Sequence, residues 1–147
     1  MGTVFINFVQ ELQDYIIANS GFTPTLSAGV NFTIGNLLDV QDLELILRKK
    51  ILLTLFEEGG TLLERGRRTQ QERSFRFIFK GNYGQEAVDH CWRLLKWLLN
   101  KRTFQTNTFR VWLARADKLP TVFVANESGS HLADFVVTLN IFSLAEG

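Results

Sequence analysis

One segment of the chain alternates so regularly that it constrains the fold more than any other part. Phe75, Phe77 and Phe79 occupy every second position. Arg76 lies between the first two, and Lys80 follows the third. Because successive side chains of a strand point to opposite faces of a sheet, this spacing predicts a strand that buries one aromatic face. The rest of the chain must therefore supply an apolar layer that covers this face.

The segment directly after this strand has the spacing of an amphipathic helix. Residues 82–85 have the form of a capping box, in which Asn82 accepts a backbone N–H and the side chain of Gln85 reaches back to Asn82. The helix predicted over 85–99 has an inner stripe of apolar side chains, namely Ala87, Cys91, Leu94, Leu95 and Leu98. We expect this stripe to cover the phenylalanine face.

The remaining periodicities predict one further helix and several strands. Apolar residues from Val4 to Ile16 recur at helical spacing, and Gly21 follows the expected end of that helix. Strand patterns occupy 30–34, 51–57, 109–113, 121–125 and 135–141, and the last two predict an antiparallel hairpin. The pattern over 37–50 fits a short helix and a strand equally well, so both alternatives stay open.

These elements predict one α+β domain over residues 1–147. The expected order is helix, strands, helix, strands, with an antiparallel or mixed sheet packed by an N-terminal helix and a central helix. Residues 59–73 carry little apolar periodicity and many charged and amide side chains. We interpret this segment as a long, exposed and mobile loop between two strands.

The predicted loop carries the strongest basic cluster of the chain. Arg65, Arg67 and Arg68 lie within four positions, and guanidinium groups in a loop can contact an acidic protein surface or phosphates. Glutamates at 57, 58, 64 and 72 dilute the local positive charge. The preferred interpretation is therefore a contact with protein, ahead of DNA binding.

Residue types that carry catalysis or bind metals are sparse in this chain. His90 and His131 lack the spacing partners of a zinc site, and His90 is expected to face solvent or an interface. Cys91, the single cysteine, falls on the apolar stripe, where burial suppresses its nucleophilicity. The formal net charge of +1 gives no field that concentrates nucleic acid or anionic lipid. We therefore expect no enzymatic activity, catalytic residue, cofactor, metal or membrane partner.

Two tryptophans are candidate interface residues. Trp97 lies off the inner stripe of the predicted helix, and Trp112 shares the outer face of its strand with Arg110. Large aromatic side chains on a protein surface are typical of protein–protein contacts. We expect both rings to be exposed on the isolated subunit and covered by another subunit.

The succession of motifs resembles the tail terminators of tailed bacteriophages, a family also described as minor capsid or tail completion proteins. The resemblance covers nearly the whole chain and rests on short motifs in a fixed order. These are a strand ending Thr33-Ile34-Gly35, a strand ending Glu58-Gly59-Gly60, the strand and turn from Phe75 to Tyr83, and a closing hairpin from Leu119 to Phe142.

The resemblance implies a structural virion protein without enzymatic activity. Copies of the chain would form a homo-oligomeric ring, typically a hexamer, on the last layer of the tail tube. The ring would end tube polymerisation and offer its other side to a head-completion or connector protein, with DNA only passing through the lumen. The protein would be located in the tail or neck of the virion after assembly in the host cytoplasm.

Two alternatives stay open. A head–tail connector or neck protein belongs to the same broad class, but it would dock on the portal side instead of ending a tube. A small enzyme or ligand-binding α+β domain belongs to a different class. The lack of a paired acid, base or nucleophile in the sequence argues against it.

Overall fold

The computed structural model describes residues 8–35, 51–65, 68–125 and 131–144, and for residues 59–65, 68–69 and 125 it describes the backbone alone. The segment 37–50, whose structure the sequence left open, and the turn at 126–130 lie outside the described residues. No helix in the described ranges combines the length and the apolar character needed to cross a membrane.

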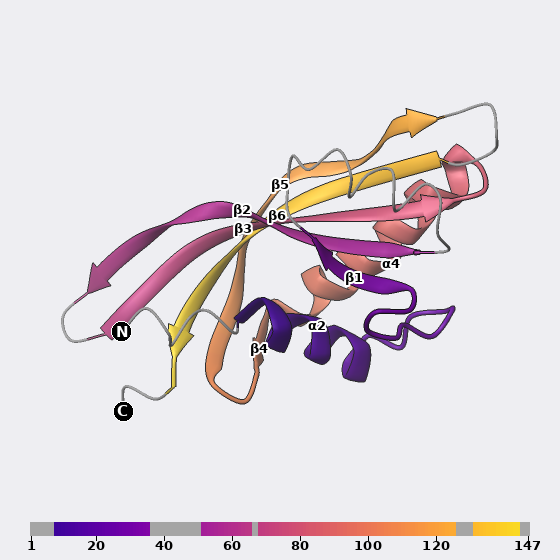
Figure 1. Ribbon diagram of the computed structural model, residues 1–147. Helices are drawn as coiled ribbons and strands as arrows, with labels where there is room; N and C mark the ends of the chain where they lie inside the picture. The colour runs from indigo at the N-terminus through magenta and orange to yellow at the C-terminus, as the bar shows by residue number, and fades with distance from the viewer. Residues whose placement is uncertain (1–7, 36–50, 66–67, 126–130, 145–147) are drawn as a thin grey trace.

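The described chain is an α+β fold of two helices and a curled, mixed, six-stranded sheet (Figure 1). The elements are α2 (Phe8–Asn19), β1 (Phe32–Gly35), β2 (Leu53–Arg65), β3 (Arg68–Gly81), α4 (Gly84–Lys101), β4 (Thr103–Gln105), β5 (Phe109–Ala125) and β6 (His131–Ser143). The strand order is β1-β2-β3-β6-β5-β4, in which β1 and β2 are parallel and the other neighbours are antiparallel. The fold class and element order predicted from the sequence are confirmed.

One face of the sheet packs against both helices, and we call it the helix face. Phe75, Phe77 and Phe79 are fully buried on it, as the alternation predicts, and the ring of Phe77 stacks on Phe135 at 5.0 Å. Phe8 of α2 joins the same core, with its ring 5.5 Å from that of Phe75. The predicted stripe of α4 is confirmed, because its five members are all buried: Ala87, Cys91, Leu94, Leu95 and Leu98.

The start of α4 differs from the predicted capping box. The N-cap is Tyr83, which makes no side-chain capping bond, and the carboxylate of Glu86 accepts the backbone N–H of Asn82 at 2.8 Å. Gln85 instead donates to Asp89. The capping-box prediction was wrong because the N-cap is Tyr83 and not Asn82, so the side chain that reaches back belongs to Glu86, one position after Gln85. Gly81 permits this tight entry, since a Cβ there would lie 2.6 Å from the backbone nitrogen of Ala87.

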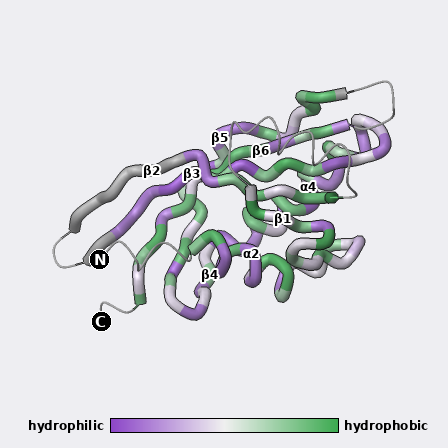
Figure 2. Tube along the Cα trace, in the orientation of Figure 1, coloured by the Kyte–Doolittle hydropathy of each residue, from purple (hydrophilic) through white to green (hydrophobic). Residues whose placement is uncertain are grey.

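Residues 59–65 and 68–73 form paired strands, so the prediction of a long loop over 59–73 was wrong in these two stretches. Strands β2 and β3 pair from Gly59↔Ser74 to Arg65↔Arg68, and a register shift between Glu57 and Gly59 carries β2 past its glycines. Figure 2 shows how hydrophilic β3 becomes toward this end of the hairpin. Backbone pairing needs no apolar periodicity, and where no helix covers the sheet the pattern disappears.

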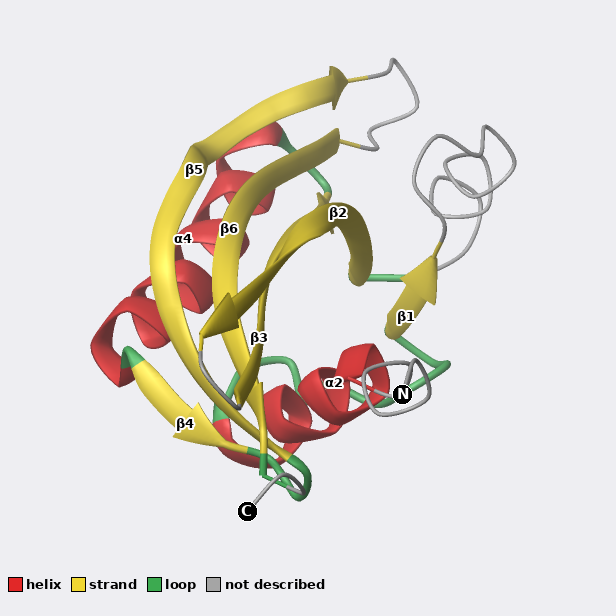
Figure 3. Ribbon diagram, turned by 90° about the vertical axis from the view of Figure 1, so that its left-hand side faces the viewer, coloured by secondary structure: helices red, strands yellow, loops and turns green. Residues whose placement is uncertain are grey.

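The segments 109–113 and 121–125 were predicted as separate strands but are parts of the single strand β5. The strand continues because three register shifts against β6 accommodate the polar residues between the two segments, and a fourth shift lies within 121–125. Figure 3 shows β5 and β6 bending together along the curl of the sheet. The predicted antiparallel pairing of 121–125 with the last strand is confirmed.

The remaining differences between the predicted and the observed strands lie at the two edges of the sheet. Strand β4 was not predicted, because three residues are too few to show a period. From Ala114 onward, no strand in the described part of the chain pairs with the outer edge of β5, which carries Lys118 and Pro120. On the other edge, Phe32 is buried as expected, whereas Val30, which precedes β1, and Ile34, near the end of β1, are exposed.

Candidate interaction surfaces

The sheet face opposite the helices, which we call the second face, carries charged side chains at its centre. Asp134 of β6 accepts hydrogen bonds from Arg76 Nε of β3 at 2.6 Å and from Lys118 Nζ of β5 at 2.5 Å. Its side chain is only 1% exposed. The Arg76 guanidinium lies 4.7 Å from the centre of the Phe123 ring. We call Arg76, Lys118, Phe123 and Asp134 the Asp134 cluster.

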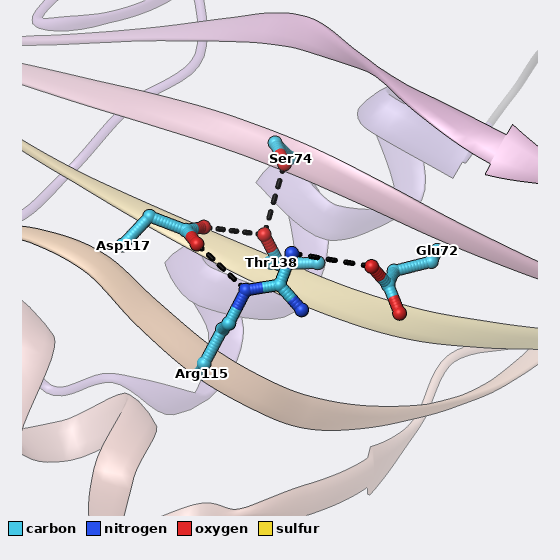
Figure 4. A network of polar contacts seen from close by, with 5 residues as sticks. All are labelled: Glu72, Ser74, Arg115, Asp117 and Thr138. Carbon is cyan, nitrogen blue, oxygen red and sulfur yellow. Dashed lines mark hydrogen bonds and ion pairs between the residues drawn. The ribbon is translucent and has the colours of Figure 1, made fainter.

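A second polar group lies beside this cluster, and we call it the Arg115 network (Figure 4). Its members are Glu72, Ser74, Arg115, Asp117 and Thr138. Arg115 donates to Asp117 at 2.7 Å and to Glu72 at 3.2 Å, and these two hydrogen bonds, in that order, raise the pKa of Arg115. The Thr138 hydroxyl donates its single hydrogen to Asp117. It must therefore accept the hydrogen bond from the Ser74 hydroxyl, 2.9 Å away. The network ties the shifted part of β5 to β6 and β3.

Trp97 is partly buried within the subunit, so the expectation that its ring is exposed was wrong. Tyr15 of α2 lies 5.9 Å from the Trp97 ring and also stacks on Phe104 at 4.5 Å. Trp97 is partly buried against the core as a result. The helix-wheel position places Trp97 off the α4 stripe correctly, but it cannot show that α2 packs beside that flank of α4.

Trp112 remains an interface candidate because 39% of it is exposed. Its ring contacts Phe142 of β6 at 4.7 Å, which fixes the ring on the second face. Trp112 also lines a groove of about 440 Å³ together with Arg110 of β5 and the three residues of β4. This groove can accept a side chain that offers both apolar contact and an acceptor for Arg110.

Two of the three arginines of the predicted loop, Arg65 and Arg68, lie at the end of the β2–β3 pairing. The backbones of Arg65 and Arg68 are paired there, and Arg67 lies outside the described residues. Along the sheet, Glu72 aligns with Asn140, which in turn aligns with Trp112. Arg68 is four residues before Glu72 in β3, or about 13 Å along the strand. The hairpin tip and Trp112 therefore lie toward the same end of the sheet.

His90 does not face solvent freely, contrary to the expectation from its helix position. Its ring packs beside two stacked rings, those of Phe22 at 5.7 Å and Phe79 at 5.8 Å. Its Nδ1 contacts the Arg93 guanidinium, which can only donate, so Nδ1 accepts and the ring is neutral. Burial, and then Arg93, lower the pKa of His90, against smaller opposing effects from Glu86 and Asp89.

Arg93 links this histidine to the segment that follows α2. It donates to the Thr23 carbonyl at 2.7 Å, and its guanidinium lies 4.3 Å from the centre of the Phe22 ring. Cys91, on the opposite flank of α4, is buried as predicted, and burial raises the pKa of its thiol. A thiol with a raised pKa is a poor nucleophile, in agreement with a packing role.

The described ranges contain no group of three or more His, Cys, Asp or Glu side chains arranged to hold a metal ion. A scan against protein-family models finds no match for this chain, and a search of curated proteins finds no similar sequence.

Proposed function

We propose that the chain is a structural subunit of a tailed-bacteriophage virion that forms a ring on the end of the tail tube. The ring ends tube polymerisation and joins the tail to head-completion proteins. The motif order in the sequence supports this proposal, and the helix, strands, helix, strands architecture agrees with it. The observation that carries it is the position of the arginine-bearing hairpin tip and the Trp112 groove toward one end of the sheet.

A subunit of a ring that ends a tube needs contacts to its neighbours in the ring and a further contact to the tube along the ring axis. The Trp112 groove suits the first, because a half-exposed indole beside a guanidinium is a typical anchor between protein subunits. The hairpin tip suits the second, because its arginines can form bidentate pairs with carboxylates of the tail tube. DNA passes through the lumen without being read.

Electron microscopy of tails assembled with and without the chain tests this function. We expect tails of uniform length when the chain is present and tubes of uncontrolled length when it is absent. Tails of normal length that fail to join heads would instead identify a connector on the portal side. Normal tails that join heads in the absence of the chain would contradict both assignments.

A triple substitution tests the hairpin tip within this assembly. Replacing Arg65, Arg67 and Arg68 with Ser should leave the fold and the ring intact and weaken attachment to the tube, increasingly so as salt is added. The matched control replaces two exposed lysines of α4, Lys96 and Lys101, with Ser. If the triple variant caps tails normally but no longer binds duplex DNA, the tip contacts DNA rather than protein.

A further inference from the structure

The Asp134 cluster holds more positive than negative charge. Two cations, Arg76 and Lys118, share the single carboxylate of Asp134, whose oxygens accept one hydrogen bond from each. The carboxylate is buried, while the side chains of Arg76 and Lys118 remain 21% and 42% exposed. A net charge of +1 is therefore fixed at a point that solvent can reach.

The donors of this cluster are only partly used. Arg76 donates to Asp134 through Nε alone, and the described residues provide no acceptor for its Nη1 and Nη2 groups. Carboxylates and phosphates bind a guanidinium through pairs of parallel N–H groups, and such a pair is uncommitted here. Lys118 likewise uses one of its three ammonium protons on Asp134, with no other acceptor among the described side chains.

The cluster is also held in place before anything binds. The Phe123 ring lies 4.7 Å from the Arg76 guanidinium and 6.0 Å from Lys118 Nζ. Asp134 is the fourth residue of β6 and is paired on one side with β3 and on the other with β5, so both cations are anchored to a rigid strand. Donors held in this way lose little side-chain entropy when they bind an anion.

The charge of the neighbouring Arg115 network decides which anion fits. Its two carboxylates, Glu72 and Asp117, share the single cation Arg115, which leaves a net charge of −1 beside the cluster. A chain of phosphates laid across this face would meet that negative charge, because nucleic acids bind to extended positive surfaces. A single carboxylate contacts the cluster alone and avoids it.

We propose that the Asp134 cluster binds one carboxylate, supplied by an aspartate or glutamate of a partner protein. The carboxylate oxygens accept from Nη1 and Nη2 of Arg76 and from Nζ of Lys118. The binding of a carboxylate follows from the geometry, whereas its assignment to an assembly partner rests on the proposed function. This contact lies on the second face and is distinct from the hairpin tip.

The test is an NMR titration of the isolated full chain with sodium acetate, with total ionic strength held constant by sodium chloride. We expect a saturable shift of the Arg76 Nε–H signal. Lys118→Met should bind acetate about ten-fold more weakly, because one of the two charge-assisted contacts is lost. That variant keeps the Arg76–Asp134 pair, and an unchanged amide spectrum elsewhere shows that it folds. Lys96→Met, an exposed lysine of α4, is the matched control.

Three outcomes would overturn this inference. They are a shift that grows linearly without saturation, an equal acetate affinity in Lys118→Met and wild type, and a duplex oligonucleotide that binds at the same signals more tightly than acetate. Because the titration uses no tails, it separates the site from the proposed function. Saturable acetate binding by a chain that fails to cap tubes would refute the function alone, and capping without acetate binding would refute the site alone.

Discussion

The two faces of the same pair of strands show how different chemistry can produce equal burial. On the helix face of β3 and β6, Phe77 stacks on Phe135, and both are fully buried. One position away on the second face, Asp134 is just as inaccessible, yet it is buried among cations. At Phe77 and Phe135 the stabilisation comes from apolar area removed from water, and at Asp134 it comes from hydrogen bonds to two cations, although the second face also buries an apolar cluster of Phe56, Ile78 and Leu132. Burial alone therefore does not reveal what a residue contributes.

The largest effect should come from the helix face. Phe77→Ala removes a fully buried ring from the middle of the core, so we expect the free energy of unfolding to fall by about 3–5 kcal/mol. Urea denaturation of the variant and the wild type measures this difference. A loss below about 1 kcal/mol would mean that the surrounding side chains collapse into the space, and the contrast between the two faces would be broken.

A smaller loss is expected on the second face at Asp134. Asp134→Asn removes the negative charge that both Arg76 and Lys118 bind, while these cations stay partly solvated. We expect a loss of about 1.5–3 kcal/mol in the free energy of unfolding, measured by the same denaturation. Asp117→Asn, at a more exposed carboxylate of that face, is the matched control and should cost less. If Asp134→Asn were more stable than the wild type, the desolvation penalty of the buried carboxylate would exceed its attraction to Arg76 and Lys118.

His90 is a titratable residue at the border of the helix face, and its contribution to stability should depend on pH. The pKa of His90 is lower in the folded protein than its ordinary value of 6.5, because burial and Arg93 disfavour the proton. The unfolded chain therefore binds the proton more readily below that value. The contribution of neutral His90 to the free energy of unfolding is fully present above pH 6.5, and it is lost as the pH falls through the lowered pKa.

Thermal unfolding between about pH 7.5 and 5 checks this prediction, with His90→Gln as the reference variant. The variant keeps a neutral acceptor near Arg93 and should lack this part of the pH dependence. If both proteins lose stability in parallel over this range, carboxylates elsewhere are responsible and His90 is not the sensor.

The smallest effect is expected at Arg115, which is more exposed than any other cation of the second face with a known ion pair. Arg115→Met should leave the unfolding midpoint unchanged at about 0.15 M salt, since exposed ion pairs contribute little to stability. A clear drop in the midpoint would mean that the whole Arg115 network acts as one unit. The Arg115 network would then contribute to stability in the same way as the Asp134 cluster.

The sequence predicted those parts of the fold in which a period coincides with burial. The α4 stripe and the alternating phenylalanines were both found because a helix covers that face of the sheet. The β2–β3 extension and the middle of β5 were missed because they are held by backbone pairing beneath polar side chains. Strand β4 is too short to show any pattern.

The candidate surfaces were predictable only in part. Trp112 was identified from its position next to Arg110, and its exposure agrees. The cover of Trp97 comes from Tyr15, which is 82 residues away in the sequence (97 − 15). The Asp134 cluster had no local signal at all, because its two cations lie 58 and 16 residues before the carboxylate. Only the sheet register brings these three side chains together.

The irregular outer edge of β5 has a consequence for how the protein behaves when it is concentrated. A long, regular strand edge is a template on which another chain can add a strand, and such addition leads to fibres. Register shifts, together with Lys118 and Pro120, interrupt that template from Ala114 onward. Unassembled copies can therefore accumulate without aggregating through this edge. Any ordered association there has to be directed by side chains, which set its geometry and its stopping point.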